Sequence, residues 1–173
     1  MYRIEKNDEH ILTNRKQFEK VVITSIIIGI IILTGFIIYY LLTPEPGFVV
    51  FGLLNDQKKA ENYPTEAKVG DNVSFYVSVE NYLNKDFTFR VEILKGDNNT
   101  ILSSTEPAKN AISYYNTTYI TLKHSETWIS EMLNVTFMLL GSNQTIIAEL
   151  WQKINSYTEK FYSNLFLRLN IIP

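Results

Sequence analysis

Few residues of this 173-residue chain have the types and spacing that catalysis or metal binding requires. Nucleophilic catalysis needs a base beside the nucleophile. After residue 43 the sequence holds one histidine, His124, in a polar Lys-His-Ser-Glu segment without a Gly-x-Ser-x-Gly motif. The carboxylates Glu61, Glu66 and Asp97 follow no spacing that would pair two of them for acid–base work. Because metal sites need clustered ligands, and the chain has two histidines and no cysteine, we expect neither an enzyme nor a metal or cofactor site.

Glycosylation is the covalent chemistry that the sequence does indicate. Asn-x-Ser/Thr sequons, the acceptor pattern for N-linked glycans, occur in modest excess over chance at Asn72, Asn98, Asn116, Asn134 and Asn143. All follow the apolar segment described next. We expect Asn134 to lie on the outer face of its strand, opposite an apolar set of Val135, Phe137 and Leu139. A glycan there would leave the core undisturbed.

One apolar segment determines where these sequons lie. Residues 21–42 read VVITSIIIGIIILTGFIIYYLL and carry no charge. A helix of this length, at ~1.5 Å per residue, is about 33 Å long and crosses a bilayer core of roughly 30 Å. A cleavable signal peptide has a shorter apolar region followed by small residues, whereas this segment ends in Tyr39, Tyr40, Leu41 and Leu42. Because buried core helices rarely run so long without a polar face, we expect an uncleaved transmembrane helix.

Basic residues flank this span closely on one side only. Arg15, Lys16 and Lys20 precede it, and the first basic residue after it is Lys58. Lys and Arg close to a span favour the cytoplasmic side of the membrane. We therefore expect residues 1–20 to be a cytoplasmic tail, residues 21–42 a single-pass helix in the lipid of the cell membrane, and residues 43–173 one extracellular domain.

Residues 43–173 contain the apolar and polar alternation of half-buried strands. The inward-facing residues predicted in two segments, 73–80 and 87–93, are Val73, Phe75, Val77, Val79, Phe87, Phe89, Val91 and Ile93. Because the Asn84-Lys85-Asp86 segment between them is turn-like, we expect these two strands to form a hairpin.

Further strands are predicted at residues 48–54, 101–104, 114–122, 128–140, 145–151 and 165–171. Residues 152–164 read as a polar connection that could carry a helical turn. Seven or eight short strands separated by turns favour two packed antiparallel sheets. We therefore expect an all-β fold, an immunoglobulin-like antiparallel sandwich on a single N-terminal transmembrane helix, although the Cys-Trp-Cys pattern of true immunoglobulin domains is absent.

Several aromatic residues are predicted on outward faces. Tyr and Trp are enriched at protein interfaces, so these residues either contact a partner or are covered by a sheet, a loop or a glycan. They are found among Tyr63, Tyr76, Tyr82, Tyr114, Tyr115, Tyr119, Trp151 and Phe166. The formal net charge of −2 argues against a nucleic-acid partner.

The start of this domain resembles a known family. Its Pro46-Gly47-Phe48 and Ala60-Glu61-Asn62-Tyr63-Pro64 segments, a Val69-Gly70 turn and a Val-rich strand that ends at Asn81 are similar to an uncharacterised archaeal membrane-protein family, a domain of unknown function. The resemblance covers most of residues 44–172. It implies an archaeal envelope protein and supplies no catalytic residues.

The loop motif Glu61, Asn62, Tyr63 and Pro64 has two readings. Pro64 restricts Tyr63 to extended backbone angles, and Asn62 can hydrogen-bond locally to fix a turn. The motif is then a rigid corner that joins the first strand to the sandwich, which is the reading we favour. The alternative is a recognition loop, because loops on rigid scaffolds often carry function.

These features favour a non-enzymatic, single-pass surface glycoprotein. We expect it to be an accessory or scaffold subunit of a membrane or envelope complex, with other envelope proteins as partners of its sandwich. One alternative is a pilin-like filament subunit, but residues 16–20 lack the small residue expected at a pilin-type cleavage site. Another is a sugar-binding or hydrolytic surface module, which would need a concave site with convergent polar groups.

Overall fold

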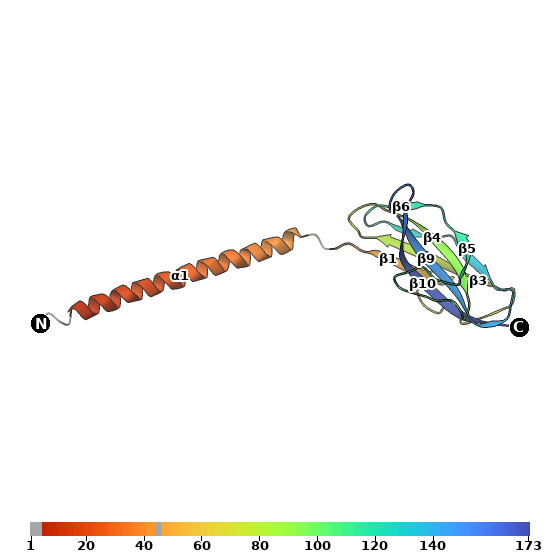
Figure 1. The fold of residues 1–173 in the computed structure, drawn as a ribbon, viewed down its shortest axis with the longest axis horizontal. Helices are drawn as coiled ribbons and strands as arrows, with labels where there is room; N and C mark the ends of the chain where they lie inside the picture. The colour runs from red at the N-terminus through yellow and green to blue at the C-terminus, as the bar shows by residue number, and fades with distance from the viewer. Residues whose placement is uncertain (1–4, 44–45) are drawn as a thin grey trace. The chain divides into compact units, whose positions relative to one another are not determined.

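A computed structural model describes residues 5–43 and 46–173 of the chain, with side chains from Arg15 onward. The chain divides into two compact units, one that ends at Glu45 and one that comprises Pro46–Pro173. The first unit is a single helix and the second is a β-structured head (Figure 1). The two units are described separately below.

Helix α1 (Glu5–Leu42) has the length and composition of a membrane anchor. The most apolar 18-residue stretch of its part from Arg15 to Leu42 has a mean hydropathy of 2.9, and none of that stretch is buried. Within the described residues it is the one helix long and apolar enough to cross a membrane. It begins 16 residues before the predicted span, so residues 5–20 of the expected tail continue the same helix.

Two threonine hydroxyls, one in α1 and one just after it, bond to backbone carbonyls of the helix. The Oγ1 atom of Thr34 donates to the carbonyl of Ile30 at 2.8 Å, and that of Thr43 donates to the carbonyl of Tyr39 at 2.7 Å. Lipid offers no hydrogen-bond partners, so polar groups of a spanning helix must be paired internally. These two hydroxyls therefore leave no unpaired donor on the surface of the helix.

The head is a sandwich of two sheets (Figure 1). The first sheet contains β1 (Val49–Leu54), β3 (Asn72–Asn81), β7 (Thr127–Ile129) and β8 (Leu133–Thr136), with β1, β7 and β8 all paired to β3. The second has the order β2 (Glu66–Lys68), β10 (Glu159–Ile172), β9 (Gly141–Lys153), β4 (Phe87–Gly96), β5 (Ile112–Asn116), and β6 (Ile120–Leu122) also pairs with β4. All pairs are antiparallel except β2 with β10. The predicted immunoglobulin-like fold class is confirmed.

The core lies between the two sheets. Every residue predicted to face inward on β3 and β4 is buried, and these side chains pack against buried residues of β9 and β10. The ring of Phe89 on β4 lies 5.7 Å from the ring of Trp128 on β7, so the two sheets are in direct aromatic contact. Packing of this kind, without any cysteine, holds the head together.

The predicted hairpin of residues 73–80 and 87–93 is wrong. Strand β3 pairs with β1, β7 and β8, whereas β4 pairs with β9, β5 and β6, so the chain crosses from one sheet to the other between them. The physical reason is Asn81, which is fully buried at the end of β3. Its Nδ2 atom donates to the carbonyls of Lys85 and Leu122 at 2.8 and 2.9 Å, and its Oδ1 atom accepts from the Leu83 N–H at 2.9 Å.

Other predicted strands differ in extent. The prediction at 101–104 is reduced to one bridge between Ile101 and Lys109, the one at 114–122 is split into β5 and β6, and the one at 128–140 is split into β7 and β8. Leu139, expected on the inner face, is 80% exposed in the loop after β8. The predicted connection at 152–164 is instead mostly strand, because β9 and β10 meet in a tight turn closed by an Ile154 N–H to Thr158 carbonyl bond of 2.9 Å.

Asparagine is the commonest residue in the left-handed turns of the head. Among non-glycine residues with positive φ, four are asparagines, Asn62, Asn84, Asn110 and Asn143, with φ between 53° and 60°. Asparagine adopts this conformation more readily than other side chains because its short amide can bond locally. The turns therefore need few glycines.

Substitution of Phe89 by alanine tests the core. The ring is fully buried against Phe87 and Trp128, so Phe89→Ala is expected to lower the free energy of unfolding by about 3–5 kcal/mol. Urea unfolding of the full chain in detergent, followed by tryptophan fluorescence, measures it. Phe166→Ala removes a ring that is 46% exposed, and this control should cost less than about 1 kcal/mol. Equal losses in the free energy of unfolding of the two variants would contradict the position of Phe89 in the core.

Candidate functional site

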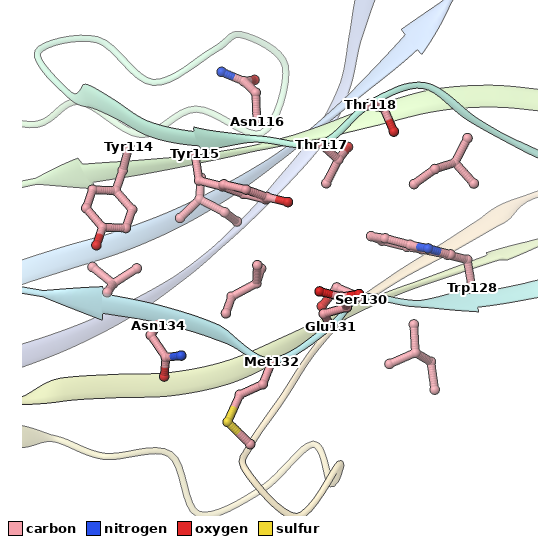
Figure 2. Close-up of a pocket in the computed structure, with 15 residues that line it drawn as sticks. Tyr114, Tyr115, Asn116, Thr117, Thr118, Trp128, Ser130, Glu131, Met132 and Asn134 are labelled. Atoms are coloured by element: carbon pink, nitrogen blue, oxygen red, sulfur yellow. The ribbon is translucent and has the colours of Figure 1, made fainter.

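An open groove of about 890 Å³ lies between edge strands of the two sheets (Figure 2). One wall is formed by β5 and the residues after it, and the other by β7, β8 and their connection. The lining residues are Ile93, Tyr114, Tyr115, Asn116, Thr117, Thr118, Ile120, Trp128, Ile129, Ser130, Glu131, Met132, Leu133, Asn134 and Val135. No other hollow described in the head is as large.

The groove combines an apolar floor with a polar rim. Ile93 and Val135, both buried in the core, lie at its base. Figure 2 shows the side chains of Tyr115 and Trp128 reaching into it from strands of different sheets. Trp128 is held edge-on against Phe89, so this wall is already formed without a ligand. Apolar hollows with a few polar groups around them are the usual form of binding sites.

A second hollow of about 350 Å³ lies at the other end of β5. Its lining includes Ile112, at the start of β5, and the loop after β8. In that loop Met138, Leu139 and Leu140 are 73%, 80% and 61% exposed. Three consecutive exposed apolar residues are unusual on a soluble surface.

A charged cluster occupies the outer face of the six-stranded sheet. The guanidinium of Arg90 donates to Glu159 through two nitrogens, at 2.8 and 2.9 Å, and to Glu92 at 2.9 Å. It also lies 5.1 Å from the centre of the Trp151 ring. The hydrogen bonds from Arg90 lower the pKa of Glu159, and those bonds in turn raise the pKa of Arg90. With its charges satisfied, the cluster ties β4 to β10.

Two residues that the sequence pointed to for other reasons belong to this cluster. Asn116 accepts a hydrogen bond from Arg90 at 2.6 Å, and the Tyr119 hydroxyl donates to Glu159 at 2.5 Å. That bond to Glu159 is the main cause of the raised pKa of Tyr119. The cluster therefore reaches the strand that forms the groove wall and fixes its position.

Glu149 is a buried carboxylate that sequence reasoning missed. It lies on β9 with 1% of its surface exposed, and it accepts from the Ala108 N–H at 2.6 Å and the Trp151 Nε1–H at 3.1 Å. Burial raises the pKa of Glu149, and Glu92 lies opposite it in the strand register. Through Ala108 it holds the loop between β4 and β5. The signal in the sequence was one charged residue inside the apolar segment Ile146–Leu150.

The Glu61, Asn62, Tyr63 and Pro64 motif lies in the loop that follows β1. The Tyr63 hydroxyl donates to the Leu53 carbonyl at 2.6 Å, and its half-buried ring packs against the core. The amide that organises the turn is Asn55, which donates to the Glu61 carbonyl at 2.8 Å. Asn62 contributes a left-handed backbone, with φ of 53°, and no described hydrogen bond from its side chain. The contacts of Tyr63 and Asn55 are those of a rigid corner.

All five sequon asparagines, Asn72, Asn98, Asn116, Asn134 and Asn143, are exposed. Two of the sequons pair across β3 and β8. The Ser74 hydroxyl donates to Asn134 Oδ1 at 2.6 Å, and the Thr136 hydroxyl donates to Asn72 Oδ1 at 2.6 Å. Each sequon hydroxyl thus bonds to the asparagine of the other sequon. Asn134 and Asn116 also line opposite walls of the groove.

His124 and the other outward aromatics were also candidates in the sequence, and His124 lies outside the groove. His124 is an exposed turn residue between β6 and β7, and its Nδ1 atom accepts from the Asn84 N–H at 3.2 Å. Among the expected outward aromatics, Tyr114, Tyr115, Tyr119 and Phe166 are exposed, while Tyr63, Tyr76, Tyr82 and Trp151 are half-buried.

The pH dependence of stability tests the environment of Glu149. Because its pKa in the folded chain is raised above 4.5, its contribution to stability is complete below pH 4.5 and is lost as pH rises through the raised value. The free energy of unfolding of the wild type relative to Glu149→Gln should therefore fall as pH rises from about 4.5. Urea unfolding across a pH series measures this difference.

Glu159 provides the opposite control. The pKa of Glu159 is lowered in the folded chain. Its contribution to stability is therefore present above its pKa in the unfolded chain and is lost as pH falls through its pKa in the folded chain. The wild type relative to Glu159→Gln should therefore lose stability toward acid. If the difference in stability between wild type and variant changed with pH in the same direction for both variants, the opposite pKa shifts of Glu149 and Glu159 would be contradicted.

Comparisons with solved structures give matches of low sequence identity. The chain is similar to the CARDB domain of a Pyrococcus furiosus protein, solved in complex with di-metal ions, with 16% identity and a TM-score of 0.48 over 76% of this chain and 93% of that one. It is also similar to a β-glucosidase from Erythrobacter marinus (10% identity, TM-score 0.41, over 73% of this chain and 16% of that one). For the sporulation control protein Spo0M from Bacillus subtilis, the values are 12% identity and a TM-score of 0.39, over 74% of this chain and 50% of that one.

Among curated protein sequences, none matches this chain. Residues 42–160 match a family described as a domain of unknown function, DUF1616. This range contains the groove, the Tyr63 corner and most of both sheets. It also confirms the resemblance to a family of unknown function, and the chain therefore belongs to the DUF1616 family.

Proposed function

We propose that this chain is a non-enzymatic, membrane-anchored surface protein that acts as an accessory or scaffold subunit of a membrane or envelope complex. Helix α1 is its anchor, and the groove between β5 and β8 is where its head binds a partner. The observation that carries the proposal is the groove itself, an exposed hollow with an apolar floor that lies between two sheet edges.

The chemistry of the groove supports binding rather than turnover. Glu131 is the one carboxylate among the residues that line it. The charged cluster of Arg90, Glu92 and Glu159 is internally satisfied by hydrogen bonds of 2.8–2.9 Å. Side chains satisfied in this way hold a surface rigid, and a rigid surface binds with a lower entropic cost.

Sidedness and glycosylation complete the proposal. Basic residues Arg15, Lys16 and Lys20 lie on the N-terminal side of the apolar segment, which favours a cytoplasmic N-terminus and an extracellular head. The exposure of all five sequon asparagines is compatible with modification on that side. We further propose an archaeal envelope as the setting, in keeping with the family resemblance of the sequence.

A sugar-binding role is the second candidate. Tyr114, Tyr115 and Trp128 line the groove together with the amide groups of Asn116 and Asn134. Aromatic rings beside polar groups provide stacking and hydrogen bonds at once. Screening the intact chain against a glycan array tests this role, and binding that is lost in Trp128→Ala would favour it over a protein partner.

Affinity purification of the intact chain from native membranes in mild detergent tests the leading proposal. A defined partner should co-purify in a fixed ratio, and Tyr115→Lys should reduce its yield because the substitution places a charge in the groove. Tyr157→Lys, at a residue that is 99% exposed in the turn between β9 and β10, is the matched control. A monomer without a partner would contradict an accessory role.

Glycosylation is tested separately by intact mass. The chain from native membranes should be heavier than its sequence mass of 20.1 kDa by the mass of one or more glycans. Asn134→Gln should remove one increment if that site is modified, and Asn155→Gln, which lies outside any sequon, should remove none. The bare sequence mass would exclude modification.

A further inference from the structure

We propose that the partner bound by this groove is an extended segment of another protein, which adds to β5 as an extra strand. Its alternate apolar side chains enter the groove and the neighbouring hollow, and its ends carry basic residues. The proposal rests on the proposed function and specifies the chemistry of the partner.

Strand β5 has the features of an open edge. It ends the path of the six-stranded sheet and pairs with β4 alone. All five of its residues, Ile112–Asn116, are exposed, and none is charged or a proline. An edge strand leaves a row of backbone N–H and carbonyl groups free to pair with another chain, and proteins usually protect such edges with lysine, proline or a bulge. The register shift of this pair leaves Tyr114 as an extra residue on β5 between the partners of Ile93 and Leu94, so β5 carries a bulge but neither a lysine nor a proline.

The hollows along β5 fit an elongated occupant. Residues 114–116 line the groove of about 890 Å³, and Ile112 lines the hollow of about 350 Å³. One strand therefore borders both. Side chains of a strand point to the same face at every second residue, so a segment laid along β5 would place alternate side chains in the two hollows. A compact ligand would fill one hollow and leave the other empty.

Charges at the two hollows indicate the ends of the occupant. Glu131 lies in the groove, and Asp97 lies in the second hollow. Glu131 has no hydrogen-bond partner among the described residues, and the described bond of the Asp97 carboxylate is local, from the Asn99 N–H at 2.8 Å. The lysine of the second hollow, Lys95, donates to the Thr136 carbonyl and lies 4.1 Å from the centre of the Tyr114 ring, so its charge is already engaged. Basic residues on the occupant would complement the two carboxylates.

A second copy of this chain fits less well. A second copy would offer only its own edges, and β5 against β5 would extend one sheet while leaving the groove beneath it unfilled. An extended segment from another protein fills the groove and pairs with the backbone together.

Selection from displayed random peptides tests the proposal on the full chain in lipid nanodiscs. Peptides of about twelve residues are long enough, at roughly 3.3 Å per residue, to follow β5 and both hollows. The enriched peptides should carry apolar residues at alternate positions and Lys or Arg near their ends. Methylating alternate backbone nitrogens of an enriched peptide should weaken binding by about tenfold or more, because main-chain hydrogen bonds carry the affinity.

Two variants test whether the peptide binds at β5. Tyr115→Lys and Ile112→Lys add a charge in each hollow and should each weaken peptide binding by about tenfold or more. Tyr157→Lys should leave it unchanged, and circular dichroism confirms that each variant is folded. The two variants are independent, so misfolding of one leaves the other to decide.

Other results would overturn the proposal. These are no enrichment, peptides with apolar residues at helical spacing, binding that ignores backbone methylation, glycan binding lost with Trp128→Ala, or a dimer of this chain that both lysine variants dissolve. Failure here is distinct from failure of the proposed function. A partner that co-purifies with both wild type and Tyr115→Lys would leave the accessory role standing while excluding β5 as its site.

Discussion

The buried amide of Asn81 is the interaction on which the topology of the head depends. Its three hydrogen bonds join the end of β3 to the turn before β4 and to the end of β6. A buried amide left without partners is costly, and the bond to Leu122 places the end of β3 beside β6, a strand of the second sheet. The two longest inward-facing apolar sets then lie opposite each other and form the core. A hairpin at the same place would have put both sets in one sheet.

The groove is a consequence of the same change of sheet. Because β4 moves to the second sheet, the strands that follow it must supply the remaining edges, and they are short: β5 and β6 on one side, β7 and β8 on the other. Between these edges lies the groove, and the buried residues Ile93 and Val135 are part of its lining. The other face of the second sheet is closed instead, by the Arg90 cluster and by the loop that Glu149 holds through Ala108. The head is therefore rigid on one face and open at one seam.

Local patterns in the sequence predicted what depends on local physics. The apolar span and the inward residues of β3 and β4 follow from periodicity and composition alone. The pairing of strands cannot be predicted in this way. Alternation determines which face of a strand is buried, but it does not determine which strand lies beside it. Asn81 was noted only as the end of a strand, since nothing in its surroundings in the sequence reveals that it contacts Leu122.

The candidate site was the least accessible to prediction. Arg90, Asn116 and Glu159 are far apart in the sequence, and their cluster exists only once β4, β5 and β10 are assembled. The groove depends on where strands stop, at residues 117–119 and 130–132, and neither break contains glycine or proline. Single-residue candidates such as Tyr115 were recognised as outward aromatics, but their role as a wall depends on a strand of the other sheet.

The asparagines in the left-handed turns have a thermodynamic consequence for a head without cysteine. Glycine would adopt the same angles at Asn62, Asn84, Asn110 and Asn143, but it would also give the denatured chain more conformations to lose. A disulfide stabilises in a related way, by restricting the denatured ensemble. Asparagine at these positions therefore narrows that ensemble in small increments distributed over four turns. Stability obtained in this way does not depend on the redox state of the surroundings, whereas a disulfide does.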